Sequence, residues 1–224
     1  MSPDTMIKDL DHINDYRLKY EYSNVGLTLV ELLVALAVSG LVALALFATF
    51  RVQGRSYNQQ EHTATLQQIL RTSMLLIERN TRMAGLNPEG EAGAKLISAN
   101  TAHIHFTSDL DKNGEINPPR EEVQFGLVSR DGGVDLYIAY HGSGRQTLAE
   151  NFGYEENGEL QGLLFTYFDL DGVEIPAPVP EYRLSDIRTI IVTLTGEDSH
   201  PSLPNPIRRS LSSVINCRNL GTWR

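Results

Sequence analysis

Residues 27–50 form an apolar run in which Glu31 is the only ionisable side chain. As a helix, with a rise of about 1.5 Å per residue, this run extends for about 36 Å and can cross a hydrocarbon core about 30 Å thick. A cleaved secretory signal is the main alternative, because Ala43 and Ala45 form a small-x-small pattern near the end of the run. However, the run is longer than such signals, contains an acid and follows a preamble of mixed charge. It therefore predicts a membrane-spanning helix.

The charge of the chain limits the kinds of partner that it can bind. The 224 residues carry a formal net charge of −9 and their Lys and Arg form no cluster, so we expect no direct nucleic-acid binding. The single cysteine, Cys217, excludes an internal disulfide. Basic residues occur on both sides of the apolar run and slightly favour an N-terminus on the cytoplasmic side. The C-terminal part is then expected in the periplasm.

Residues 51–86 predict a continuation of the helix with a different pattern. Apolar side chains recur at steps of three and four, which is typical of a helix with one buried face. Gly85 and Pro88 predict its end. The predicted stripe, which includes two polar residues, consists of Leu66, Ile69, Leu70, Ser73, Leu76, Ile77, Asn80, Met83 and Ala84. We therefore expect one helix over residues 27–84, with a transmembrane first half (27–50) and an amphipathic second half (51–86).

Residues 87–224 predict a β domain. Six short runs rich in β-branched and aromatic residues are separated by turn-forming pairs such as Asn157-Gly158 and Asp171-Gly172. The runs are residues 102–107, 121–128, 134–140, 162–168, 187–195 and 210–216. Strands with an inward apolar face need a cover, and the amphipathic half of the helix can provide it. The predicted fold class is α+β, with a long N-terminal helix packed on an antiparallel β-sheet.

The start of the apolar run carries a more specific signal. Gly26 is followed by Leu-Thr-Leu-Val-Glu-Leu-Leu-Val-Ala, which closely resembles the signal of type IV prepilins, shared by pilins and type II secretion pseudopilins. The resemblance implies that residues 1–26 are a leader and that prepilin peptidase cuts between Gly26 and Leu27. It also implies that Leu27 is N-methylated, and that Glu31 attracts the N-terminal amine of a neighbouring subunit during assembly. Two features depart from the commonest pattern: Leu27 replaces phenylalanine, and the leader is long and acidic.

Four later segments resemble PilW-type minor pilins: residues 79–85, 165–172, 187–194 and 208–219. This resemblance implies a type IV pilin-like fold and a structural subunit, not an enzyme, that takes part in the initiation or tip complex of a type IV pilus. The implied partners are prepilin peptidase, other minor pilins, the major pilin and the inner membrane. A minor pseudopilin of a type II secretion system shares the signal and the architecture, and it remains the alternative.

An acidic turn begins at Asp109 and suggests calcium as a candidate cofactor. The candidate ligands are Asp109, Asp111, Asn113 and Glu115. Their alternate spacing follows the start of an EF-hand-type loop. The pattern then fails, because Arg120 stands where a bidentate acid is expected, and acidic turns are common between strands without any metal. A membrane-tethered, calcium-dependent binding or adhesion domain that never polymerises is the alternative of another class.

Two histidines, His103 and His105, are expected on one face of a strand, where they could share a metal ion. No third ligand is apparent from the sequence. The simpler interpretation is an exposed strand face.

Overall fold

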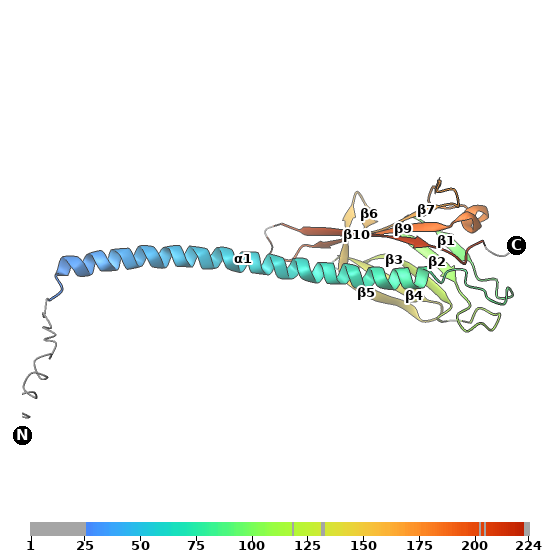
Figure 1. The fold of residues 1–224 in the computed structure, drawn as a ribbon, viewed down its shortest axis with the longest axis horizontal. Coiled ribbons are helices and arrows are strands. Elements are labelled where there is room, and N and C mark those ends of the chain that lie inside the picture. Colours follow the sequence, from blue (N-terminus) through green and yellow to red (C-terminus); the bar gives the residue numbers. More distant parts are fainter. Residues whose placement is uncertain (1–25, 118, 131–132, 202, 204, 222–224) are drawn as a thin grey trace, which may run out of the picture. The chain divides into compact units, whose positions relative to one another are not determined.

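The computed structural model describes residues 26–117, 119–130, 133–201, 203 and 205–221. The chain divides into two compact units, Met1–Arg51 and Val52–Arg224. One helix, α1 (Leu29–Thr81), contributes to both units, and the strands follow it in the second (Figure 1). The predicted leader, residues 1–26, lies outside the described residues except for Gly26.

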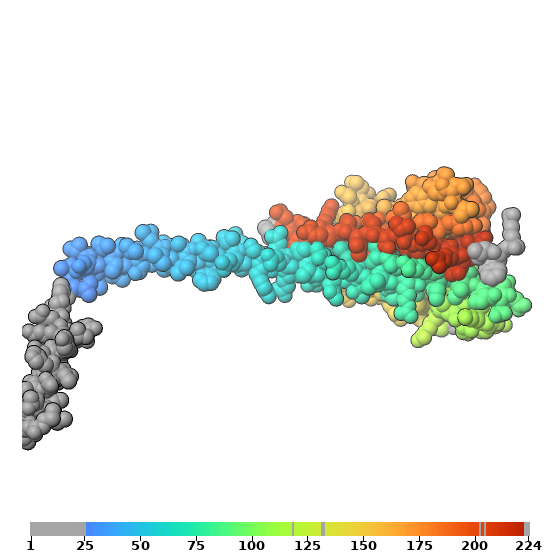
Figure 2. All heavy atoms as spheres, in the orientation of Figure 1, coloured from blue at the N-terminus to red at the C-terminus, as the bar shows by residue number. Residues whose placement is uncertain are grey.

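The described part of the first unit is almost entirely helical. Residues 26–28 precede the helix, which begins at Leu29. Every residue from 26 to 51 is exposed. Figure 2 draws the atoms of this part of the helix in blue. By length and composition, α1 is able to cross a membrane. This result is compatible with the predicted single-pass anchor.

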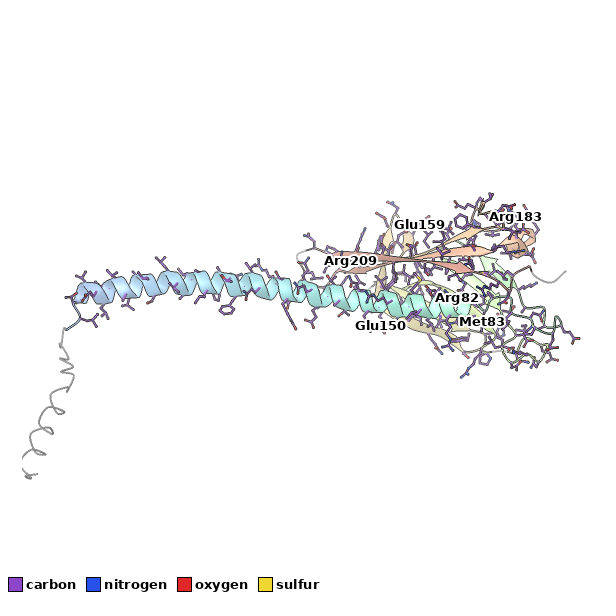
Figure 3. All side chains as sticks on the ribbon, viewed as in Figure 1. Arg82, Met83, Glu150, Glu159, Arg183 and Arg209 are labelled. Atoms are coloured by element: carbon purple, nitrogen blue, oxygen red, sulfur yellow. The ribbon has the colours of Figure 1, made fainter. Side chains whose placement is uncertain are left out.

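The second half of α1 buries one stripe within the second unit. Its buried residues are Leu66, Leu70, Ser73, Met74, Ile77 and Thr81. Leu66, Leu70, Ser73 and Ile77 follow the predicted stripe at steps of three and four, whereas the buried Met74 and Thr81 were not predicted on it. The helix ends at Thr81 instead of Ala84, and the chain continues as a turn to Gly85. Met83, predicted on the buried stripe, lies exposed in this turn (Figure 3).

Gly85 explains why the helix stops here. Its φ of +76° belongs to the left-handed region, which favours glycine. A Cβ atom at this position would also lie 2.7 Å from Leu220 Cδ2, so no larger residue fits without a shift.

Ten strands form two antiparallel sheets in the described part of the chain. The first sheet has the order β1-β2-β3-β4-β5-β6 and the second has the order β10-β9-β7-β8. The first comprises β1 (Leu96–Ala99), β2 (His103–Thr107), β3 (Glu122–Arg130), β4 (Gly133–Tyr140), β5 (Gly144–Glu156) and β6 (Glu159–Gln161). The second comprises β7 (Leu163–Phe168), β8 (Glu174–Ile175), β9 (Thr189–Asp198) and β10 (Ile207–Asn216), and a short 3-10 helix, η2 (Glu181–Asp186), precedes β9.

The predicted α+β fold class is confirmed, and each of the six predicted strands is present as β2, β3, β4, β7, β9 or β10. The prediction of a single sheet is wrong, because the strands divide between two. The division falls at Gly162, the one residue between β6 and β7. Its φ of +134° redirects the chain from one sheet to the other.

The buried stripe of α1 and the inner faces of both sheets form one apolar core. Leu66 of α1 packs against Gly196 of β9, where a Cβ atom would lie 2.6 Å from Leu66 Cδ1. The glycine therefore permits close packing of the helix on the second sheet. A hydrogen bond from the Ser213 hydroxyl of β10 to the Glu78 carboxylate of α1 adds a polar link.

Candidate functional site

The predicted cleavage point lies immediately before α1. Gly26 and Leu27 are outside the helix, and both are exposed. Apart from its two chain neighbours, no described residue has a heavy atom within 4 Å of the position where a Cβ atom of Gly26 would stand. The peptide bond between these two residues is therefore open to a protease in the described structure.

Glu31 closes a hydrogen-bonded cap on the first turn of α1. The Thr28 amide and hydroxyl donate to Glu31 Oε2 over 2.9 and 3.0 Å, and the Glu31 amide donates back to the Thr28 hydroxyl over 3.2 Å. This reciprocal pattern is a capping box, in which the N-cap residue and the third helical residue satisfy each other's amides. It gives the carboxylate a structural task that the sequence analysis missed. The spacing Thr28-x-x-Glu31 was the available signal.

The apolar part of α1 ends with a cation over an aromatic ring. The Arg51 guanidinium lies 6.0 Å from the centroid of the Phe47 ring, at the edge of the distance range for a cation–π contact. Within the run, the Thr49 hydroxyl donates to the Ala45 carbonyl over 2.9 Å. Because the helix itself satisfies this hydroxyl, it needs no water partner. The segment therefore has the properties of a membrane span except at Glu31.

The acidic turn lies in the second unit between β2 and β3. Carboxylate oxygens of Asp109, Asp111 and Glu121 all lie within 4.8 Å of one another. Asp109 and Glu121 are buried and Asp111 is exposed. Two of the four predicted ligands therefore meet, together with Glu121, which was not among them. Asn113 Oδ1 accepts from the Glu115 amide over 2.8 Å, and Glu115 is exposed and not among the three gathered residues.

Backbone amides hold these carboxylates in place. Glu121 accepts from the amides of Leu110, Asp111 and Asn117 over 2.6 to 3.1 Å. Asp109 accepts from two further amides of the turn, over 3.1 and 3.2 Å. Among the described residues, no basic side chain forms an ion pair with the three carboxylates. Hydrogen bonds thus shape a turn that gathers hard oxygen ligands, the type that calcium prefers.

His103 and His105 both lie on β2, as predicted. The structure adds a carboxylate beside His105, because His105 Nε2 lies 2.8 Å from Glu122 Oε1. Sequence spacing could not reveal this neighbour, since Glu122 reaches His105 only through the pairing of β2 with β3.

Comparison with known proteins gives structural similarity but no sequence match. No family model matches the chain, and no curated protein matches its sequence. Among solved structures, a type IV-like pilin from Thermus thermophilus is similar to 70% of this chain over 98% of its own length, with 11% identity and a TM-score of 0.40. The α+β assignment therefore rests on the helix and sheets of this chain itself.

Proposed function

We propose that this chain is a minor pilin-like structural subunit rather than an enzyme. Prepilin peptidase cuts it between Gly26 and Leu27 and methylates Leu27, and the product joins the initiation or tip complex of a type IV pilus. The observation that supports this proposal is the position of the signal at residues 26–35. Its cleavage point is exposed immediately before a capped helix, and the part of this helix from Leu29 to Phe50 is exposed and has Glu31 as its only charged residue.

The capping box favours a role for Glu31 in docking. An acid at the centre of a membrane helix costs about 2.5–3.5 kcal/mol, and less near the end of the span. Glu31 Oε2 accepts hydrogen bonds from Thr28, whereas Oε1 accepts no hydrogen bond from the described residues. Cleavage would create an ammonium group at Leu27. The free oxygen of Glu31 is then available to the corresponding ammonium group of a neighbouring subunit, and the two charges offset each other's desolvation.

The two units have separate tasks in this proposal. The first half of α1 anchors the precursor in the inner membrane and later packs among the helices of other minor pilins and of the major pilin. The second unit, with its own core, is the part exposed in the periplasm and then on the pilus.

The test is the N-terminus of the mature protein. We expect mass spectrometry to find N-methyl-Leu27 at the start of the wild-type chain. Gly26→Val is expected to leave only the uncut precursor, because a branched side chain replaces the glycine after which the peptidase cuts. Gly40→Ala is the matched control: no atom crowds this position, and it should be cut normally. An unmethylated start at another residue would disprove the proposed processing.

A minor pseudopilin of a type II secretion system is the nearest alternative, because the same signal serves both machines. Loss of the chain should abolish twitching if the pilus proposal is correct. Loss of protein export with normal twitching would assign the chain to the secretion system instead.

A calcium-dependent, membrane-tethered binding domain is a second candidate function. The gathering of Asp109, Asp111 and Glu121 favours it. These three carboxylates would hold the ion, which would offset their mutual repulsion. This candidate function predicts that the chain is active without polymerising.

Calcium is expected to raise the melting temperature of the full chain in detergent. An ion at 100 times its Kd adds about 2.7 kcal/mol to stability, equivalent to about 5–10 °C for a chain of this size. Asp111→Asn should lose this shift, because the amide keeps the shape of the side chain but not its charge. Asp171→Asn, which changes an exposed acid in another turn, should keep it. A melting temperature that is equal with calcium and with chelator would exclude the calcium site.

A further inference from the structure

Three polar side chains meet on the outer face of the first sheet. They are His105 of β2, Glu122 of β3 and His141, which directly follows β4. His105 Nε2 lies 2.8 Å from Glu122 Oε1, and His141 Nδ1 lies 2.9 Å from Glu122 Oε2. One carboxylate therefore stands between two imidazoles that come from different segments of the chain. We call these three residues the His–Glu–His cluster.

The regular pairing of β2 with β3 brings His105 and Glu122 together. His105 is paired with Gln124 and Thr107 with Glu122, so the Glu122 side chain lies diagonally across from His105 on the same face. The amide of His141 donates to the Glu122 carbonyl over 3.2 Å, which fixes the backbone of the following turn beside β3. The neighbours of His105 in β2, Ile104 and Phe106, are buried in the core. The cluster therefore stands on a rigid support.

The three side chains of the cluster differ in their exposure to water. His105 and Glu122 keep 16% and 17% of their side-chain surface exposed, whereas His141 keeps 57%. Two members are thus largely shielded from water, and the third stands at the entrance. Water competes less for a charge in such a position than at the open surface.

We propose that the His–Glu–His cluster binds one divalent transition-metal ion of the zinc type. Two imidazoles and one carboxylate are a donor set that zinc accepts, with water in the remaining position. Each imidazole now meets a different carboxylate oxygen. At metal–nitrogen distances of about 2.0–2.1 Å, both rings must turn toward one shared ion. His141 can make this movement because it lies on an exposed turn.

The surrounding side chains are compatible with a bound cation. Gln124 Nε2 lies 3.5 Å from His105 Nε2. The Gln124 side chain can move with the His105 ring when the metal ion replaces the proton on His105 Nε2. Arg145 lies over the Tyr137 ring, 4.8 Å from its centroid.

The test is zinc binding by the full chain in detergent, after removal of metals with a chelator. We expect one zinc ion per wild-type chain and a cobalt-substituted form with the absorption bands of a tetrahedral site. His141→Gln should weaken zinc binding by more than the 10- to 100-fold typical for loss of an outer-shell partner. Since His141 is exposed, this variant keeps its fold. Glu122→Gln, which keeps the size of the side chain, should weaken binding as much.

Two controls locate the ion. His200→Gln removes a histidine outside the cluster, and Asp111→Asn removes a charge from the acidic turn; both should bind zinc as the wild type does. The proposal is overturned if the wild-type chain binds no zinc, or if His141→Gln and Glu122→Gln bind it normally. It is equally overturned if either control loses the ion, because the ion would then be held elsewhere.

Discussion

Glu31→Gln is expected to exclude the subunit from filaments while leaving it in the membrane. Glutamine keeps the length of the side chain and can still accept the hydrogen bonds from Thr28, so the cap on α1 remains. What disappears is the negative charge offered to the amine of a neighbouring subunit. Breaking one partner of a buried ion pair costs about 3–5 kcal/mol. Incorporation should therefore fall by about two to four orders of magnitude, as measured by the amount of the chain in sheared filaments and in membranes.

Thr28→Ala is the matched control, because it removes the hydroxyl that caps the helix and keeps the acid. Loss of an N-cap costs about 1 kcal/mol, so this variant should still enter filaments, in reduced amount. If Thr28→Ala is excluded as strongly as Glu31→Gln, then assembly depends on the cap and not on the charge. If Glu31→Gln assembles normally, the docking role of Glu31 is disproved.

The strands show which part of the fold was predictable. β9 alternates regularly between core and surface, and its period of two predicted it directly. β5 was missed although it is the longest strand, because its register with β4 shifts twice and Asn151 within it has a φ of +48°. One shift displaces the pairing by two residues and the other by one, and the one-residue shift moves the buried side chains to the other parity, so no single period extends along the strand. The partners of each strand, and hence the two sheets, depend on contacts distant in sequence.

The acidic turn shows the same limit at a candidate site. Spacing identified Asp109 and Asp111, which lie two residues apart in one turn. It selected Glu115 as a further ligand because EF-hand-type loops have a regular pattern. The structure selects Glu121 instead, since the pairing of β2 with β3 brings the two ends of the loop together: the Ser108 amide donates to the Glu121 carbonyl over 2.9 Å. A local motif cannot anticipate a ligand that the sheet supplies.

Leu70→Ala is expected to destabilise the second unit by about 2–5 kcal/mol, the range for truncating a buried leucine. Leu70 is 2% exposed and belongs to the core between α1 and the sheets, whereas Leu75, five residues later in the same helix, is 66% exposed. Leu75→Ala makes the same chemical change and should stay within about 0.5 kcal/mol of the wild type. Because both sites are in the interior of α1, the effect of alanine on helix propensity cancels in the comparison.

The measurement is urea unfolding of the full chain in detergent, with the signal taken from the sheets. Leu70→Ala should lower the midpoint without a change of slope, and Leu75→Ala should leave both unchanged. Equal midpoints for the two variants would mean that the sheets keep their stability without the face of α1 that carries Leu70. The amphipathic half would then have to bury its stripe against other subunits instead. A clear difference would mean that the second unit has a complete core before any assembly begins.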